Sequence, residues 1–297
     1  MTFTTDFGAG SPLVAAMKGV VLAGCPNAVL VDVSHEVPRF DVSAGAFMLF
    51  AGTRHFGGGS VHLAVVDPGV GSTRRRLIVQ AGSRFYIGPD NGLFSIVIDE
   101  VGVQAVHELA PRPHGAPTFE GRDVFAPAAA ALASGVPVDS LGPRTDPPLG
   151  LPDTGPRVLW TDGFGNLVTN LKPPVRKLRV HNHDVVATAK TYAEARPGEP
   201  FVYVGSMGYL EVGVREARAD KLLGARPGMR VETIQPLPGG IDPSVMMTLE
   251  DGTSMFLPTR VVHVDIGPES CEYRLAFHEL PEDDAARLAA LVSGRDS

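Results

Sequence analysis

Acidic side chains follow two apolar segments in the N-terminal half of the chain. Asp67 comes directly after the largely apolar run Val61–Val66, and Asp6 follows Phe3-Thr4-Thr5. The carboxyl ends of the strands in an open α/β sheet form the edge where such sheets bind ligands. Two carboxylates at this edge could bind ribose hydroxyls or orient a nucleophile. A simple turn at Asp67 and a helix cap at Asp6 explain the same residues equally well.

A guanidinium follows Asp67 at a short distance in the sequence. Arg74 lies seven positions later, beyond a glycine-rich turn at 68–72, so this loop could fold back and bring Arg74 to the carboxylate. Arg75 and Arg76 follow directly. Three consecutive arginines are also typical of a solvent-exposed edge, from which we expect only one to point inward. The Gly-x-Gly spacing does not open a helix, which excludes a dinucleotide-binding fingerprint.

A second group of polar residues lies in the turn 162–166, between two predicted strands. It places Asp162, Phe164 and Asn166 close together. Such a turn can hold an amino acid or a purine, because Asn166 can satisfy both a donor and an acceptor on an adenine edge. A plain hairpin turn is the competing interpretation. The nine histidines show no metal-binding spacing and the two cysteines form no C-x-x-C pair, so we expect no metal site.

The elements expected to position these residues divide the chain near residue 150. Before it, apolar runs alternate with helical segments, which predicts an α/β domain. A helix begins at Ser11-Pro12 and ends at Gly24, Val29–Val33 is expected to form a buried strand, and a second helix covers Ala126–Ser134. A hairpin is expected between Leu77 and Ile87.

A proline-rich stretch at 142–156 is typical of a linker between domains. Short strand-like runs separated by Gly, Pro and Asn turns follow it, which predicts an antiparallel β domain. A third composition begins near residue 233, with strands expected at Ser244–Leu249, Ser254–Val264 and Glu272–Glu279 and a helix at Glu282–Val292. The expected division is 1–150, 156–232 and 233–297.

Composition restricts the class of partner. The 297 residues are 44% hydrophobic and 20% charged, as in folded rather than disordered chains. A net charge of −7 leaves no basic excess to neutralise phosphates, so nucleic acid and anionic membranes are not expected partners and a small molecule is. No apolar run reaches the roughly 18 residues needed to span a membrane, and no leader follows Met1. We therefore expect a cytoplasmic protein.

Seven short motifs occur in order between about residues 3 and 232. They are Thr4–Gly8, Asp32–Val37, Val65–Gly71, Gly88–Leu93, Gly121–Pro127, Phe164–Asn170 and Gly205–Glu211. Together they resemble the S-adenosyl-L-methionine (SAM) hydroxide adenosyltransferases, or SAM hydrolases, which are related to the fluorinase and chlorinase. The resemblance implies an N-terminal α/β domain with a mostly parallel sheet and an antiparallel, β-barrel-like C-terminal domain. It also implies a homotrimer whose sites lie between one subunit's N-terminal domain and a neighbour's C-terminal domain.

The implied reaction is attack of water or hydroxide on the 5′ carbon of SAM, releasing adenosine and L-methionine without a cofactor. By resemblance, Asp67 would orient or deprotonate the water, and Arg74 would hold that carboxylate in place. Asp6 and Phe40 would bind the ribose, and Asn166 the adenine. The full set of expected substrate-binding residues is Asp6, Phe40, Phe119, Gly121, Asp162, Phe164, Asn166, Ser206, Met207, Glu211 and Val214, with Asp162 and Ser206 on the methionine and Glu211 and Val214 on the adenine side.

The chain departs from the family pattern at two positions. Glu120 occupies the place of a histidine that completes the water-activating set in the hydrolases. A carboxylate can accept a proton, but it adds like charge beside Asp67, so slow turnover, a shifted pH optimum or loss of activity are all open outcomes. Met207 stands where the halogenases carry arginine, which leaves the methionine carboxylate to Ser206 and the backbone.

Two further interpretations remain open. The segment from about Glu250 to Val292 resembles the C-terminal half of a PilZ domain, which binds cyclic di-GMP; a hairpin and helix packed on the preceding domain explain it as well. Glu120 and this extra segment also favour an alternative function, a catalytically impaired SAM- or adenosine-binding module with a regulatory tail.

Overall fold

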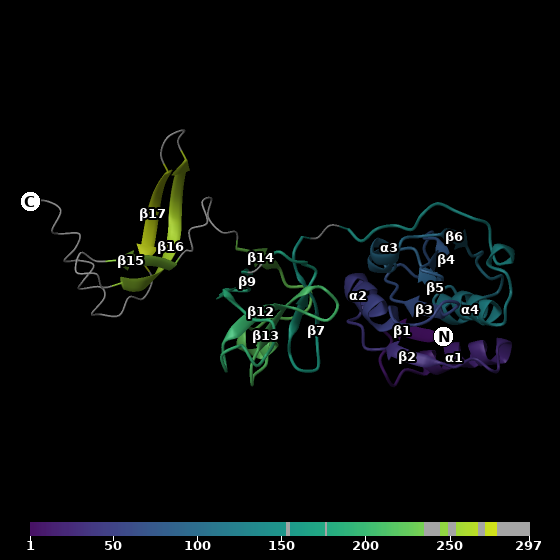
Figure 1. Cartoon of the computed structure of the whole chain (residues 1–297). Helices are drawn as coiled ribbons and strands as arrows, with labels where there is room; N and C mark the ends of the chain where they lie inside the picture. Colours follow the sequence, from purple (N-terminus) through teal and green to yellow (C-terminus); the bar gives the residue numbers. More distant parts are fainter. Residues whose placement is uncertain (153–154, 176, 235–243, 249–253, 267–270, 278–297) are drawn as a thin grey trace, which may run out of the picture. The chain divides into compact units, whose positions relative to one another are not determined.

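The structure is a computed structural model that describes residues 1–152, 155–175, 177–234, 244–248, 254–266 and 271–277 (Figure 1). The chain divides into two compact units, Met1–Thr233 and Ile234–Ser297. The first unit is mixed α/β with several sheets and comprises an α/β part followed by a β part.

A six-stranded sheet forms the N-terminal part, in the order β2-β1-β3-β5-β4-β6. Its strands are β1 (Thr2–Thr5), β2 (Val31–Ser34), β3 (Val61–Val65), β4 (Arg76–Ala81), β5 (Arg84–Pro89) and β6 (Ala105–Glu108). The pairs among β2, β1, β3 and β5 are parallel, and β4 is antiparallel to β5 and β6. The sheet is thus mostly parallel, with the expected hairpin at β4 and β5.

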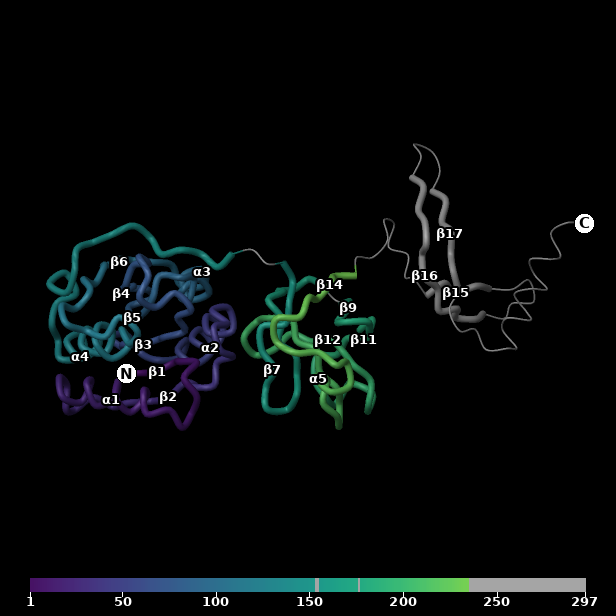
Figure 2. The backbone as a smooth tube through the Cα atoms, turned by 180° about the vertical axis from the view of Figure 1, so that it is seen from behind, coloured from purple at the N-terminus to yellow at the C-terminus, as the bar shows by residue number. Residues whose placement is uncertain are grey.

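Helices cover the sheet, as the backbone trace shows (Figure 2). They are α1 (Pro12–Gly24), α2 (Val42–Thr53), α3 (Ser95–Val101) and α4 (Ala126–Ala133), with a short π-helix at Gly121–Phe125 and a 3₁₀ turn at Val138–Ser140. One core cluster contains Phe47 of α2 and Val97 of α3, and another contains Met17 of α1 and Ala129 of α4. Because both faces of the central strands are covered, β1 and β3 are buried throughout.

The second strand corrects one expectation. The strand predicted to be buried at Val29–Val33 is β2, which begins at Val31 and pairs only with β1 at the edge of the sheet. Val31 and Asp32 are exposed. An apolar run is therefore not sufficient evidence of burial when a strand lies at an edge, where one side has no neighbour.

Helix caps explain where α1 and α2 begin. The Ser11 hydroxyl accepts a hydrogen bond from Leu13 N at 3.3 Å, and Pro12 takes the first helical position. The Asp41 carboxylate accepts from Ser43 N at 3.1 Å and from Ala44 N at 3.0 Å. The Asp41 cap fixes the loop before α2, which carries Phe40.

Arg75 ties the linker to the N-terminal sheet. Its Nε donates to Asp90 Oδ2 at 2.8 Å, and its Nη atoms donate to Thr145 Oγ1 at 3.1 Å and to Pro147 O at 2.8 Å. Leu149 N donates to the other oxygen of Asp90 at 2.7 Å. The proline-rich stretch therefore runs along the N-terminal part as a bonded segment.

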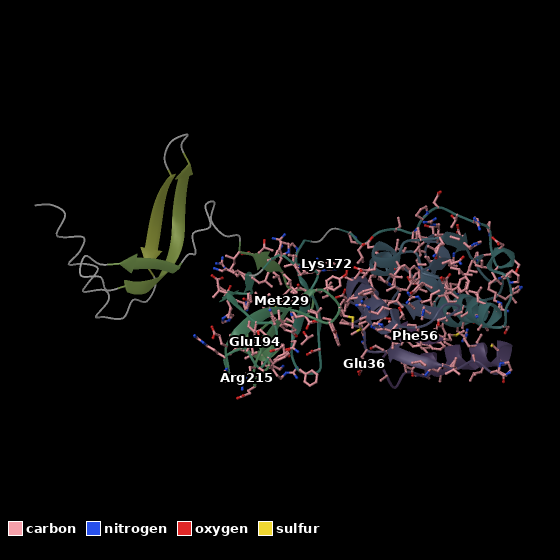
Figure 3. The ribbon with its side chains drawn as sticks, in the orientation of Figure 1. Glu36, Phe56, Lys172, Glu194, Arg215 and Met229 are labelled. Carbon is pink, nitrogen blue, oxygen red and sulfur yellow. The ribbon has the colours of Figure 1, made fainter. Side chains whose placement is uncertain are left out.

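Two sheets form the β part of the first unit. Their strands are β7 (Val158–Thr161), β8 (Leu167–Thr169), β9 (Leu178–Val180), β10 (His183–Val185), β11 (Ala187–Thr188), β12 (Pro200–Val204), β13 (Leu210–Val214) and β14 (Val231–Thr233), with one helical turn, α5 (Ala219–Leu222). The orders are β11-β12-β13-β8-β7 and β10-β9-β14, antiparallel except for β11 and β12. They share a core that includes Val180 and Val212, with Met229 packed against it (Figure 3).

The expectation of a barrel-like domain is met only in its coarser form. Among the described residues, no named strand of one sheet pairs with a named strand of the other, although an isolated bridge between Arg157 and Arg230 links the residues that precede β7 and β14. The described strands therefore form an antiparallel β domain without a closed barrel. Closure needs a continuous ring of paired strands.

The second unit is described by its backbone alone. Its strands β15 (Ser244–Thr248), β16 (Ser254–Ile266) and β17 (Cys271–Phe277) form an antiparallel sheet in that order. The helix expected at Glu282–Val292 lies outside the described residues, and the PilZ resemblance stays a prediction. Within the part of the chain that is described, no helix combines the length and apolar character needed to cross a membrane.

Candidate active site

The ends of β1 and β3 bring Asp6 and Asp67 to one edge of the sheet. These strands are parallel neighbours, with Thr5 opposite Val65, so the chain leaves both at the same edge. A cavity of about 350 Å³ lies there. Six of the residues predicted from sequence line it: Asp6, Phe40, Asp67, Phe119, Glu120 and Gly121. Arg39, which the sequence analysis missed, lines it as well.

Arg74 folds back onto Asp67. Arg74 Nε donates to Asp67 Oδ1 at 2.8 Å, and Nη2 donates to Oδ2, which makes the pair bidentate. Only 4% of the Asp67 side chain and 8% of the Arg74 side chain are exposed. The Arg74 guanidinium also lies over the Phe125 ring, 5.7 Å from its centroid. The carboxylate is therefore held in one orientation at the cavity wall.

Glu120 joins the same cluster through a second arginine. It precedes the π-helix, and its Oε2 accepts from Arg74 Nη2 at 2.6 Å. Its Oε1 accepts from Arg76 Nε at 2.6 Å. The expectation that only one of the three arginines points inward is thus wrong. Alternate side chains of an extended segment share a face, so Arg74 and Arg76 face the cluster while Arg75 faces Asp90 and the linker.

Phe40 is held at the cavity by its backbone. Phe40 N donates to Asp6 Oδ2 at 2.9 Å, and Phe40 has a positive φ of 64°. Its side chain is 67% exposed. Phe119 packs edge-on against Phe7, with ring centroids 6.1 Å apart. The cavity thus has an aromatic wall and an open aromatic ring beside two carboxylates.

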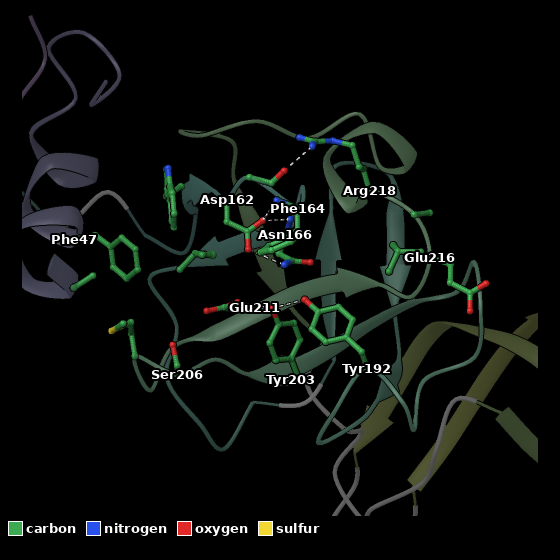
Figure 4. Close-up of a pocket in the computed structure, with 17 residues that line it drawn as sticks. Phe47, Asp162, Phe164, Asn166, Tyr192, Tyr203, Ser206, Glu211, Glu216 and Arg218 are labelled. Carbon is green, nitrogen blue, oxygen red and sulfur yellow. Dashed lines mark hydrogen bonds between the residues drawn. The ribbon is translucent and has the colours of Figure 1, made fainter. Parts of the chain in front are cut away.

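A larger cavity of about 1020 Å³ lies in the β domain, bounded also by Phe47 and Ala51 of α2 (Figure 4). The seven remaining predicted substrate-binding residues line it: Asp162, Phe164, Asn166, Ser206, Met207, Glu211 and Val214. None of them lines the first cavity, and none of the first cavity's residues lines this one. Within one chain, the predicted site residues therefore form two separate groups.

The turn at 162–166 is organised by its own acid. Asp162 Oδ1 accepts from Phe164 N at 2.9 Å and from Asn166 N at 2.8 Å, and Oδ2 accepts from Asn166 Nδ2 at 2.7 Å. Phe164 is 82% exposed. The hairpin-turn interpretation and the binding interpretation are compatible, because the turn bonds fix the amide of Asn166 at the wall of the cavity.

Glu211 contributes its side chain to the hydrogen bonds at the wall of this cavity. The Tyr203 hydroxyl donates to Glu211 Oε2, and Tyr203 and Tyr192 share a hydrogen bond of 2.8 Å between their hydroxyls (Figure 4). Burial raises the pKa of Glu211, with the nearby Asp162 acting in the same direction and the Tyr203 bond opposing it. Burial likewise raises the pKa of Tyr203.

Several lining residues were missed from sequence. Tyr192, Tyr203, Trp160 and Arg218 line the larger cavity. Tyr203 lies directly opposite Glu211 in the pairing of β12 with β13, so a hypothesis about strand register would have found it. Trp160 and Arg218 carried no sequence signal that separated them from ordinary strand and loop residues.

Arg54 approaches the position where the sequence lacks an arginine. Its Nη1 lies 3.5 Å from Met207 Sδ, and its guanidinium lies over the Phe50 ring at 5.2 Å from the centroid. Met207 therefore has a cation beside it that comes from the residue after α2. No group of three or more His, Cys, Asp or Glu side chains suited to a metal ion occurs among the described residues.

Comparison with known proteins decides the family. The model of the SAM hydroxide adenosyltransferase N-terminal domain matches residues 1–142, and that of the C-terminal domain matches residues 156–232. An (R)-S-adenosyl-L-methionine hydrolase of Thermus thermophilus is 40% identical over 252 residues, covering 78% of this chain and 98% of the relative. The chain belongs to the SAM hydroxide adenosyltransferase family.

More distant relatives and solved structures agree with this membership. A fluorinase of an Actinoplanes species is 26% identical over 264 residues, covering 71% of this chain and 89% of the relative. The crystal structure of an uncharacterized conserved protein from Thermotoga maritima superimposes with a TM-score of 0.71 at 30% identity, covering 77% of this chain and 98% of that chain. The adenosyltransferase family models reach residue 232, and the second unit lies beyond them.

Proposed function

We propose that this adenosyltransferase hydrolyses SAM to adenosine and L-methionine by attack of water on the 5′ carbon of the adenosyl group. The observation that carries the proposal is the buried, bidentate Asp67–Arg74 pair in the wall of a cavity shared with Asp6 and Phe40. Similarity to relatives named (R)-S-adenosyl-L-methionine hydrolase supports the same reaction.

The reaction requires few functional groups from the protein. The leaving group is a sulfonium, which departs as a neutral thioether, so the substrate supplies its own electrophile and no cofactor is required. An anionic nucleophile and a sulfonium lose their charges in the transition state, which a dry cavity favours. Asp67 would orient the water and accept its proton, while Arg74 keeps that carboxylate charged and in place.

Water rather than halide is the proposed nucleophile. A desolvated halide 4 Å from the Asp67 carboxylate would be repelled by about 4 kcal/mol at an effective dielectric constant near 20. The Asp67 carboxylate therefore favours water over halide as the nucleophile, although the chain is related to fluorinases.

The complete site is proposed to need a neighbouring subunit. The N-terminal cavity carries the groups suited to ribose and water, and the β-domain cavity carries those suited to adenine and methionine. Since the two cavities share no lining residue, we propose a homotrimer in which one subunit's first cavity faces a neighbour's second. The proposal includes a 1–150 adenosyl-binding domain, a 156–232 domain, a 233–297 tail and a cytoplasmic location.

The reaction is tested by incubating the pure protein with SAM in oxygen-18 water. The label is expected in the 5′ hydroxyl of adenosine. Asp67→Asn is expected to lower the rate of adenosine formation by about 10²- to 10⁴-fold, because it removes the general base. Asp99→Asn, on an exposed position of α3, is the matched control and is expected to keep the wild-type rate.

The same experiment separates the enzyme from a binding module. Glu120 in place of the family's histidine is the observation that favours a catalytically impaired module with a regulatory tail. No adenosine above the Asp67→Asn level would refute hydrolysis. Binding of SAM by calorimetry in that same preparation would then support the module.

A further inference from the structure

The cluster around Glu120 contains two carboxylates and two guanidiniums, all nearly enclosed. The exposed fractions of the side chains are 4% for Asp67, 8% for Arg74, 6% for Glu120 and 13% for Arg76. Their formal charges cancel. A buried charge is stable only when paired, so each of these four groups depends on the others.

Arg76 supplies the second guanidinium that bonds Glu120. Arg76 Nε and Nη2 lie 2.6 and 2.5 Å from Glu120 Oε1, and Arg74 Nη2 lies 2.6 Å from Oε2. The two Glu120 oxygens therefore bond different guanidiniums, whereas both Asp67 oxygens bond Arg74 among the described residues. Glu120 is thus held between two arginines, and Asp67 is held by one.

The remaining charged groups near the cluster do not replace Arg76. Asp6 at the end of β1 and Arg39 before α2 line the same cavity. Arg122 and Asp123 on the π-helix pair with each other, at 2.6 Å between Nε and Oδ1. Arg74 bonds both carboxylates, so without Arg76 it would have to balance the charge of Glu120 as well as that of Asp67.

We infer that Arg76 is a positioning residue of this adenosyltransferase: it neutralises Glu120, keeps Arg74 on Asp67 and leaves Asp67 as the group that acts on water. The inference rests on the proposed hydrolysis and specifies how this chain accommodates a carboxylate where the family's hydrolases have histidine. Glu120 then has a positioning role as well and is not the base.

A double-mutant cycle of charge-neutralising variants tests the inference through the pH dependence of kcat/KM. Arg76→Gln leaves the cluster with a net charge of −1, so the acid limb of the profile is expected to move up by about 1 pH unit, which lowers the rate about tenfold at any fixed pH on that limb. Glu120→Gln leaves +1, and the limb is expected to move down. The double variant Arg76→Gln/Glu120→Gln is neutral again, and its limb is expected to return towards the wild-type position.

Arg75→Gln is the matched control, because it removes a neighbouring arginine that serves a different carboxylate, Asp90. Its acid limb is expected to stay in place even if its Tm falls. An Arg76→Gln profile that superimposes on wild type would overturn the inference. Loss of activity in Glu120→Gln that the double variant does not restore would also overturn it, since Glu120 would then be the base.

Thermal denaturation tests the mutual dependence of the four side chains without any substrate. Arg76→Gln is expected to lower the Tm by several degrees, and the double variant to recover at least half of that loss, because a buried pair tolerates joint neutralisation better than loss of one partner. This recovery is expected even if the wild-type protein forms no adenosine, so failure of the proposed function and failure of the inference give different results. If the double variant recovered none of the lost Tm, the inference that Arg76 and Glu120 depend on each other would be overturned.

Discussion

Among single residues, the contact between Tyr203 and Glu211 was hardest to foresee. Asp67 and Arg74 are close in sequence, so their approach could be predicted from a short glycine-rich loop. Tyr203 and Glu211 meet only because β12 and β13 pair in one register, which a single sequence does not reveal. Sequence analysis therefore finds local constellations and misses those that strand pairing creates.

The buried carboxyl of Glu211 predicts a pH-dependent stability. Because its pKa is raised in the folded state, the folded protein binds more protons than the unfolded chain above the ordinary value of 4.5, and the free energy of unfolding falls as the pH rises through that window. Glu211→Gln keeps an acceptor for the Tyr203 hydroxyl and removes the titration. We expect the stability of wild type relative to this variant to decrease as the pH rises above the ordinary carboxyl value of 4.5, measured by urea denaturation over a range of pH values. A constant difference across that range would contradict the prediction.

At the level of elements, predictions succeeded where caps and periodicity are strong. The helix expected from Ser11-Pro12 to Gly24 is observed as Pro12–Gly24, and β4 and β5 form the expected hairpin. The helix α2 was not predicted, because residues on all of its sides are buried and its apolar residues show no single stripe. Its cap residue, Asp41, was the one available signal.

The turn between β12 and β13 has room for only a glycine at one position. A Cβ on Gly205 would lie 1.8 Å from Glu211 Oε1. Gly205→Ala is expected to displace the Glu211 side chain and lower the free energy of unfolding by about 1 to 3 kcal/mol. Gly19, exposed in α1 with no atom within 4 Å of an added Cβ, is the matched control.

Gly19→Ala is expected to raise the free energy of unfolding by about 0.5 to 1 kcal/mol, since alanine is the better helix former. Urea denaturation of both variants gives the comparison. If Gly205→Ala were as stable as wild type, the Glu211 side chain would have an alternative position and the turn would be less restricted than described.

At the level of the whole molecule, the main feature is the separation of the predicted site residues into two cavities within one chain. Composition favoured a small ligand over nucleic acid, and the motifs led to the family that the comparisons establish. Neither the sequence nor a single chain reveals which subunits meet. Assembly therefore has to be tested with mixed subunits.

Mixed trimers should recover activity from two impaired variants. Asp67→Asn damages the first cavity and Asn166→Leu the second. If each site joins cavities from two subunits, co-expressed variants in equal amounts should contain about a quarter of fully intact sites, and adenosine formation should rise well above that of either variant alone. Size-exclusion chromatography gives the oligomeric state of the same samples.

Homogeneous samples of each variant, mixed without subunit exchange, are the control. This mixture is expected to be no more active than either variant alone. An inactive co-expressed sample would mean that each site is built within one chain, and would remove the neighbouring subunit from the proposed function.

The alternation of the three arginines links two tasks that proteins usually keep apart. Arg74 and Arg76 face the carboxylates of the cavity, while Arg75 bonds the linker that leads to the β domain. One residue inserted between Arg74 and Arg75 would exchange the two faces of the strand from that point onward. The bonds of the Asp67–Glu120 cluster and the bonds to the linker thus depend on the same alternation of side chains. An odd-length insertion or deletion at the start of β4 would therefore change both sets of bonds together.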